Sequence, residues 1–310
     1  MATHHLDDTH PHAFWDNSLP PRVRIQPGDT VIFETLEASA NQVTPAATSE
    51  ALQTLSFDPI HPLTGPVYVE GAEPGDSLEV EILRLQHKGW GWNAVLPGFG
   101  LLADDFSTPY LHHYKVSDTH CEFRPDILIP YEPFCGVMGV GPRESGRLTT
   151  IPPRENGGNI DIRHLTPGTR VFFPVLVSGA LFSCGDCHSA QGDGEVNGTG
   201  IETPMTVTLR FQLHKNAPIP ELRFITPPGK LTVADSGGYY VTTAHGTDLF
   251  KNAQQAVRYM IDHLVQEYNM TCEQAYCLCG AAVDLKISEI VDAPNWIVSA
   301  YLPLGIFIKA

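Results

Sequence analysis

The sequence predicts a mainly β protein whose C-terminal part is α+β. Pro-Gly turns recur in the first two thirds of the chain, and the stretches around them alternate apolar with polar residues. Pro followed by Gly suits a type II turn, and alternation with a period of two is typical of strands with one buried face. Repeated hairpins of this kind indicate a β-sandwich or a barrel rather than alternating strands and helices. The turns lie at Pro27-Gly28, Pro74-Gly75 and Pro167-Gly168.

Five of the six strands predicted in this region flank these turns in chain order. Residues 1–14 come before them and are rich in His and Asp, so we expect a flexible, solvated arm. The alternation is clearest at residues 205–213, where every second side chain is apolar. Strands are predicted at residues 23–25, 31–33, 67–70, 78–82, 171–175 and 205–213.

The pattern changes after residue 214. Apolar residues at helical spacing predict an amphipathic helix over residues 249–265. Thr271 and Gln274 form a capping-box sequence at the start of a second, shorter helix. Further strands are predicted at residues 222–225, 239–242, 285–291 and 297–302, with a turn at 292–295. We therefore divide the chain into an arm (1–14), a β-rich region that carries the site (15–215) and an α+β region (216–310).

Charge and composition exclude several classes of function. The formal net charge is −16, and an acidic surface repels phosphate backbones, so we expect no nucleic-acid partner. We expect no membrane span and no secretory signal, because the chain has no apolar run long enough for either. Seven cysteines are an odd number, which suits reduced thiols and a cytoplasmic protein better than a disulfide framework.

Residues 178–202 concentrate the potential chemistry of the chain, in what we predict to be a loop between two strands. Asp186 and His188 are two residues apart, so on an extended chain they face the same side and can meet one ion. Asp193 and Glu195 follow in a glycine-rich segment and can supply a further ligand or a general base. A metal-activated water is a nucleophile at neutral pH, so hydrolysis of an acyl or amide bond follows from such a site.

Two other parts of the sequence can belong either to the site or to the structural framework. His61 lies between Pro59 and Pro62, which stiffen the chain around a positioned ligand or around a surface histidine. The apolar, glycine-broken stretch 88–102 can form the wall of a small pocket or ordinary core.

The residues of the segment 178–202 also permit other interpretations. Cys184 and Cys187 can form half of a structural zinc site completed by Cys277 and Cys279, or a redox dithiol. The acidic segment Asp193–Glu195 can be a plain turn or a structural calcium loop. A metal-stabilised β-sandwich binding module without turnover is therefore an alternative to an enzyme, since calcium-dependent modules also use Asp and Glu in glycine-rich loops.

The segment SGALFSCGDCHSAQGDGE at residues 178–195 closely resembles the signature of the acetamidase/formamidase family. Four more segments agree in the same order: FWDNSLPP (14–21), HPLTGP (61–66), VEGAEPGD (69–76) and PGFGLL (97–102). The resemblance implies a β-sandwich joined to a barrel-like β region and an α+β part. It also implies a metal-containing homo-oligomer that hydrolyses formamide or acetamide and releases ammonia, with a urea-like or carbamoyl substrate as the alternative.

The resemblance leads to specific assignments. His61, Asp186 and His188 are predicted to hold the ion, taken to be Zn²⁺, with Asp186 and His188 also counted as catalytic. Glu195 is predicted to act as general base and then as general acid. Asp193 is predicted to join the metal ligands or to hold a second, calcium-like ion. The predicted substrate pocket consists of Trp92, Asn93 and Phe99, which would exclude bulky acyl groups.

Overall fold

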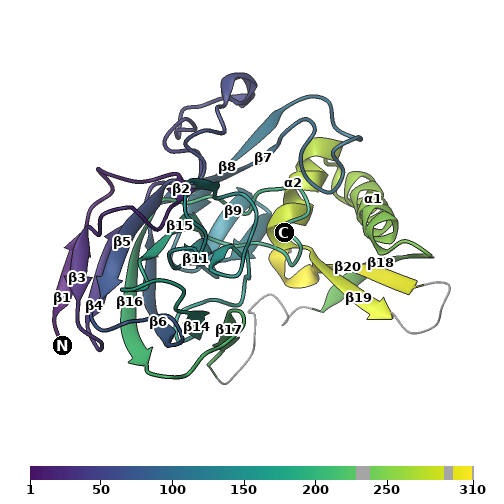
Figure 1. Ribbon diagram of the computed structural model, residues 1–310. Helices are drawn as coiled ribbons and strands as arrows, with labels where there is room; N and C mark the ends of the chain where they lie inside the picture. Colours follow the sequence, from purple (N-terminus) through teal and green to yellow (C-terminus); the bar gives the residue numbers. More distant parts are fainter. Residues whose placement is uncertain (228–237, 290–295, 309–310) are drawn as a thin grey trace.

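The computed structural model describes residues 1–227, 238–289 and 296–308 (Figure 1). Its first large sheet has six strands, and all six strands predicted for the β-rich region are found in it or in the second sheet. In order across this sheet the strands are β1 (Thr3–Leu6), β4 (Thr30–Glu34), β16 (Met205–His214), β6 (Ser77–His87), β14 (Arg170–Pro174) and β17 (Arg223–Ile225).

A second sheet carries the middle of the signature segment. Its five strands are, in order, β13 (Gly157–Asn159), β11 (Phe134–Gly139), β15 (Phe182–His188), β5 (Leu63–Val69) and β3 (Val23–Ile25). The expectation of a loop over residues 178–202 was therefore wrong for its first half, because β15 is the central strand of this sheet. Side chains from both large sheets pack into one hydrophobic cluster, which includes Phe33, Phe173, Phe182 and Phe211.

The remaining strands form three smaller groups. One four-stranded sheet has the order β10 (Ile127–Pro130), β9 (His120–Arg124), β8 (Tyr110–Val116) and β7 (Trp90–Val95), and β12 (Leu148–Thr149) pairs with β2 (Phe14–Trp15). The C-terminal sheet has the order β18 (Tyr239–Gly246), β20 (Trp296–Pro303) and β19 (Asp284–Glu289). Each sheet of the described residues is an open ladder with two separate edge strands, so the barrel-like region is not a closed barrel.

The C-terminal part contains both predicted helices, which lie beside the C-terminal sheet in Figure 1. They are α1 (Leu249–Tyr268) and α2 (Cys272–Ala282), and two short 3-10 helices, η1 (Ser49–Thr54) and η3 (Leu304–Ile306), complete the set described. The capping box of Thr271 and Gln274 is formed as predicted. One hydrophobic cluster joins these helices to β8, β9 and β10, so it includes residues on both sides of the boundary predicted at 215/216. The predicted turn at 292–295 lies outside the described residues.

The N-terminal arm differs from its prediction. Strand β1 pairs in parallel with β4, from Thr3 opposite Thr30 to Leu6 opposite Phe33. Asp29 holds this strand in place: its Oδ1 accepts a hydrogen bond from the backbone N–H of Ala2 at 2.6 Å, and its Oδ2 lies 3.1 Å from His4 Nε2. Sequence reasoning missed this because the partners of the arm are in a different segment of the chain.

The start of α1 gives a test of local stability. Asp248 is its N-cap, and the carboxylate accepts hydrogen bonds from the backbone N–H groups of Phe250 and Lys251 at 3.0 and 3.2 Å. Asp248→Ala should lower the free energy of unfolding by about 1 kcal/mol, because two helix donors lose their acceptor. Denaturant titration measures this loss. Asp248→Ser keeps an acceptor at the cap and should retain most of the stability, so an equal loss in both variants would contradict the capping role.

Candidate metal and catalytic site

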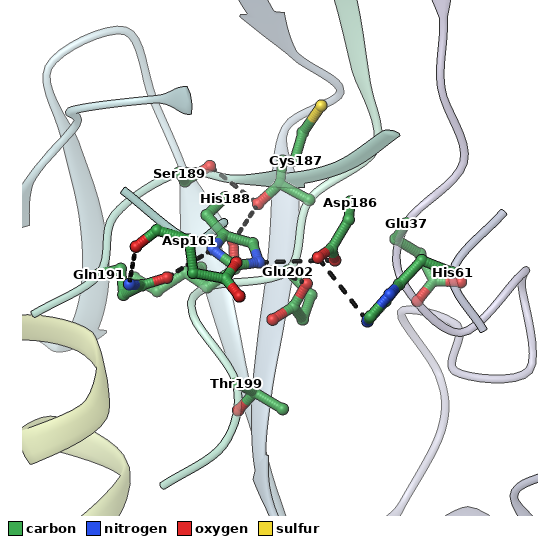
Figure 2. Close-up of polar contacts among 12 residues, drawn as sticks. Glu37, His61, Asp161, Asp186, Cys187, His188, Ser189, Gln191, Thr199 and Glu202 are labelled. Carbon is green, nitrogen blue, oxygen red and sulfur yellow. Dashed lines mark hydrogen bonds and ion pairs between the residues drawn. The ribbon is translucent and has the colours of Figure 1, made fainter. Parts of the chain in front are cut away.

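The site is built around Asp186 on the central strand β15. Asp186 has a positive φ of 50°, so it departs from the regular alternation on which the sequence argument relied. Its Oδ1 lies 3.5 Å from His188 Nε2, and its Oδ2 lies 3.7 Å from His61 Nε2. Figure 2 shows the two imidazoles on opposite sides of this carboxylate. The structure thus brings both predicted histidines to the carboxylate of Asp186. His61 is not a member of either close group of potential metal ligands among the described residues, so its part in holding an ion stays a prediction.

Glu202 is a member of the site that sequence reasoning missed. Its Oε2 lies 3.1 Å from His188 Nε2, and its side chain is 3% exposed. The segment around it runs between β15 and β7: Glu202 N–H donates to Trp92 O at 2.7 Å, and Thr203 N–H donates to Cys187 O at 2.8 Å. These bonds join two sheets and place Glu202 directly beside His188 (Figure 2).

Asp161 is the second missed residue. It follows β13, and its carboxylate comes within reach of Asp186 and His188, with ligand atoms of the three within 4.8 Å of one another. A second such group consists of His188, Glu195 and Glu202. The approach depends on Gly136 in β11, where a Cβ would lie 2.5 Å from Asp161 Oδ1 and 2.9 Å from Asp186 Oδ2. A segment far from the signature therefore completes the cluster.

Gln191 orients His188. Its Nε2 donates to the backbone oxygen of Asp161 at 3.0 Å, which leaves its Oε1 to accept a hydrogen bond from His188 Nδ1 at 2.8 Å. With the proton of the neutral imidazole on Nδ1, the lone pair of Nε2 faces Asp186 and Glu202. A hydrogen bond to the far nitrogen is the usual support of a metal-binding histidine.

The pKa values of the cluster reflect many acids in little solvent. Burial raises the pKa of Glu195 and of Glu202 to about 8, although the charge of His188 opposes the shift. Burial also raises the pKa of Asp161 well above its usual range. For His188, burial acts to lower the pKa, but the carboxylates of Glu202 and Asp186 outweigh it and raise the pKa well above normal. The cluster therefore favours additional positive charge.

The donor set fits a divalent cation. Nine buried side-chain polar atoms of the described residues have no hydrogen-bond partner, and four of them face one another in this cluster. Buried polar atoms are nearly always paired, so a convergence of unpaired imidazole and carboxylate atoms indicates a missing partner of positive charge. The four atoms are Asp161 Oδ1, Asp186 Oδ1, His188 Nε2 and Glu202 Oε2. His61 Nδ1 also has no partner, but it is the ring nitrogen other than the Nε2 that faces Asp186.

A small cavity of about 70 Å³ opens onto this cluster. Its charged side consists of His61, Asp186, Glu195 and Glu202, and its remaining wall is mainly apolar. The apolar part comes from the loop that contains η1, from β7 and the segment that follows it, and from the segment after β12. These apolar side chains are Ala38, Leu55, Phe57, Ile60, Trp92, Leu96, Phe99 and Ile151. The space admits a ligand of only a few non-hydrogen atoms.

Two of the three residues predicted to line the substrate pocket do line this cavity, and the third does not. Trp92 and Phe99 line the cavity, and the indole Nε1 of Trp92 donates to Glu37 Oε2 at 2.9 Å. Asn93 does not line it: its Nδ2 donates to Cys277 O at 2.9 Å, and its Oδ1 accepts from the hydroxyl of Tyr114. Because neighbouring side chains on a strand point to opposite faces, Trp92 and Asn93 cannot both face the cavity.

Asp193 lies outside the two metal-capable groups of the described residues. Its backbone N–H donates to Asp284 Oδ1 at 3.0 Å, and Arg163 forms an ion pair with that same carboxylate. Burial and Asp284 raise the pKa of Asp193, while Arg163 opposes the shift. The structure thus places Asp193 beside an acid–arginine pair rather than with His61, Asp186 and His188.

The cysteines of the signature are core residues. Cys184 and Cys187 belong to the cluster between the two large sheets, whereas Cys277 and Cys279 belong to the cluster around α1 and α2. The structural zinc site considered for these four thiols is therefore not formed. Sγ of Cys187 lies 3.6 Å from Sγ of Cys135 on the adjacent strand, and burial is the main cause of the raised pKa of Cys187.

Among the described residues, neither helix has the length and the apolar composition that a membrane-spanning helix needs.

Fold and site together define a class: a mainly β protein with a buried imidazole–carboxylate centre, fit to hold a divalent cation beside a small cavity. The model of the Acetamidase/Formamidase family matches residues 2–148 and 144–309. The chain therefore belongs to the acetamidase/formamidase family, and its class is that of hydrolases acting on amide C–N bonds.

Individual relatives agree with this membership. The chain is 28% identical to a formamidase of Methylophilus methylotrophus over 371 residues, which covers 96% of this chain and 89% of the relative. It is 28% identical to an acetamidase of Mycolicibacterium smegmatis, with coverage of 87% and 85%. Among solved structures, a gamma lactamase from Delftia acidovorans superimposes with a TM-score of 0.91 at 26% identity, covering 99% of this chain and 93% of that one.

Proposed function

We propose that the protein hydrolyses small linear amides, with formamide and acetamide as substrates, and releases ammonia and a short carboxylic acid. The observation that carries the proposal is the cavity of about 70 Å³. Imidazole and carboxylate side chains that can bind a cation line one side of it, and aromatic and aliphatic side chains line the others. A cavity of this size favours a one- or two-carbon acyl group. The names of the formamidase and acetamidase relatives support the same substrates.

His61, Asp186, His188, Glu202 and Asp161 would hold the cation, with Zn²⁺ as the proposed ion. Mixed imidazole and carboxylate donors suit Zn²⁺ better than Ca²⁺, which prefers oxygen ligands alone. When bound, the cation polarises a carbonyl and makes a water molecule more acidic. The described surroundings of Asp193 do not support the second, calcium-like ion, because Arg163 already supplies positive charge there.

Glu195 is the proposed proton carrier. It borders the cavity and forms no ion pair among the described residues, whereas Glu202 is held at 3.1 Å by His188. Glu195 takes a proton from the water while the water oxygen bonds to the carbonyl carbon of the substrate. It then returns a proton to the nitrogen as the C–N bond breaks, so that ammonia leaves and the acid remains. Asp186 keeps the two imidazoles oriented by its opposite oxygens.

Chelation tests the function directly. Removing divalent cations should abolish ammonia release from formamide, and adding Zn²⁺ back should restore it, because the cluster would lose its electrophile. Metal content is measured by elemental analysis alongside ammonia. In the loaded enzyme, activity should fall from formamide and acetamide to propionamide and benzamide, with a γ-lactam and urea as further comparisons. Hydrolysis by fully chelated protein would exclude the metal mechanism, and a metal-loaded protein without turnover would support a binding module instead.

Localisation and assembly complete the proposal. All seven cysteines are unpaired thiols, which supports a reducing compartment such as the cytoplasm. A homo-oligomer is proposed from the family resemblance, and light scattering on the purified protein measures the number of subunits. A monomer at working concentration would refute it.

A further inference from the structure

The polar groups of the cavity wall outside the charged cluster differ in one respect, namely whether they already have hydrogen-bond partners. Ser39 Oγ donates to Glu37 Oε1 at 2.8 Å and accepts from the backbone N–H of Val43 at 2.8 Å. Thr199 Oγ1 accepts from the backbone N–H of Ala94 at 3.0 Å and from Asn197 Nδ2 at 3.1 Å. Both hydroxyls are therefore engaged within the protein and have little capacity left for a ligand.

Asn159 is different. It lines the same cavity, and its Nδ2 donates to the backbone oxygen of Ile151 at 3.1 Å. That bond sets the orientation of the amide, because the reverse orientation would place two oxygens against each other. Its Oδ1 is buried and has no hydrogen-bond partner in the described structure. A residue of the cavity wall thus has a buried, neutral, fixed acceptor without a donor in the described structure.

The position of Asn159 is rigid. It is the last residue of β13, where it pairs with Val137 of β11, and it precedes the site residue Asp161 by two positions. The two residues that follow Asn159 are also bound to β11, since Ile160 and Asp161 both donate their backbone N–H groups to Gly136 O. The acceptor is therefore held by the same two strands that hold one of the cluster carboxylates, which suits a group that orients a ligand.

We propose that Asn159 is the positioning residue that recognises the nitrogen of the substrate: its Oδ1 accepts a hydrogen bond from the N–H group of the scissile amide. The proposal rests on the proposed amide hydrolysis and adds its nitrogen specificity. A primary amide has two N–H donors at its nitrogen, whereas an ester has an alkoxy oxygen without a proton there. A site that leaves its own polar group unpaired with the wrong substrate discriminates strongly against that substrate. Asn159 would therefore select primary amides over esters of the same acid.

The test compares an amide with an ester in the metal-loaded enzyme. Asn159→Leu should reduce kcat/KM for formamide about ten- to hundredfold, because the substrate N–H loses its acceptor. Hydrolysis of methyl formate should change less than about threefold, because the ester makes no such bond. If methyl formate is not turned over, its inhibition constant against formamide hydrolysis is the readout, with the same limit. Asn159→Ser retains an acceptor on a shorter side chain. Its activity on formamide should therefore lie between that of Asn159→Leu and that of the wild-type enzyme.

Ile151→Val is the matched control, because it trims the same wall and leaves the backbone oxygen that orients Asn159 in place. It should change amide and ester rates by the same factor. Metal content of each variant identifies loss of the cluster. If Asn159→Leu keeps its metal and lowers amide and ester rates in parallel, Asn159 is structural and the proposal is overturned. If the wild-type enzyme hydrolyses no amide at all, the proposed function itself fails, which is a separate result.

Discussion

Glu195→Gln is expected to lower kcat for formamide by about two to four orders of magnitude while the bound metal stays unchanged. Glutamine keeps the size of the side chain but cannot take up or return a proton. Glu195 borders the cavity and has no ion-pair partner among the described residues, so the imidazoles and the other acids should keep their positions. Steady-state ammonia release and elemental analysis on the same preparation measure both quantities.

Glu202→Gln is the matched comparison. Glu202 lies 3.1 Å from His188 Nε2, so the loss of its charge should weaken metal binding as well as turnover. The two isosteric changes should therefore separate, with metal retained in one variant and weakened in the other. An active Glu195→Gln enzyme would remove Glu195 from the mechanism, and metal loss in that variant would make Glu195 a ligand rather than the base.

The second large effect is expected at Gly136. A Cβ there would lie 2.5 Å from Asp161 Oδ1 and 2.9 Å from Asp186 Oδ2, so Gly136→Ala must push apart two carboxylates of the centre. Gly136 is not one of the described glycines with a positive φ, so its backbone conformation is open to alanine. The effect of the substitution therefore comes from the steric clash of the added Cβ. We expect loss of bound metal and of ammonia release to near background, measured as for Glu195.

Gly139→Ala provides the control on the same strand. A Cβ at Gly139 would lie 2.7 Å from Asn156 O, so this variant is also crowded, but away from the cluster acids. Both variants should lose stability in denaturant titration, whereas only Gly136→Ala should lose metal. If the two variants retain equal amounts of metal, the close approach at Gly136 is not what maintains the centre.

Local patterns were sufficient for most of the secondary structure. Alternation of apolar and polar residues predicted β4, β14 and β16 closely and the first half of β6, and the apolar stripe predicted α1. The capping box of α2 was predicted from two residues because its hydrogen bonds are local. Local patterns failed for β1, since the acceptor Asp29 and the neighbouring strand β4 lie well beyond the arm itself.

The candidate site was predicted in part. His61, Asp186 and His188 do meet, and the resemblance of residues 178–195 to the family signature was the signal that singled them out. Glu202 ends the same glycine-rich stretch, and its position close behind the signature was the available signal. Asp161 lies outside the segment that resembles the signature, and no spacing rule relates it to Asp186.

By itself, the sequence determined the strand-rich fold class, the two helices, the family and the stretch that carries the chemistry. These depend on periodicity, capping and motif, all of which are properties of neighbouring residues. Only the tertiary structure decided which acids share the centre and which side chains enclose the cavity. Glu202 reaches His188 through cross-strand bonds to β7 and β15, and Asp161 reaches Asp186 because Gly136 lacks a side chain. Such contacts come from strand pairing and from the absence of volume, neither of which is visible within one segment of the chain.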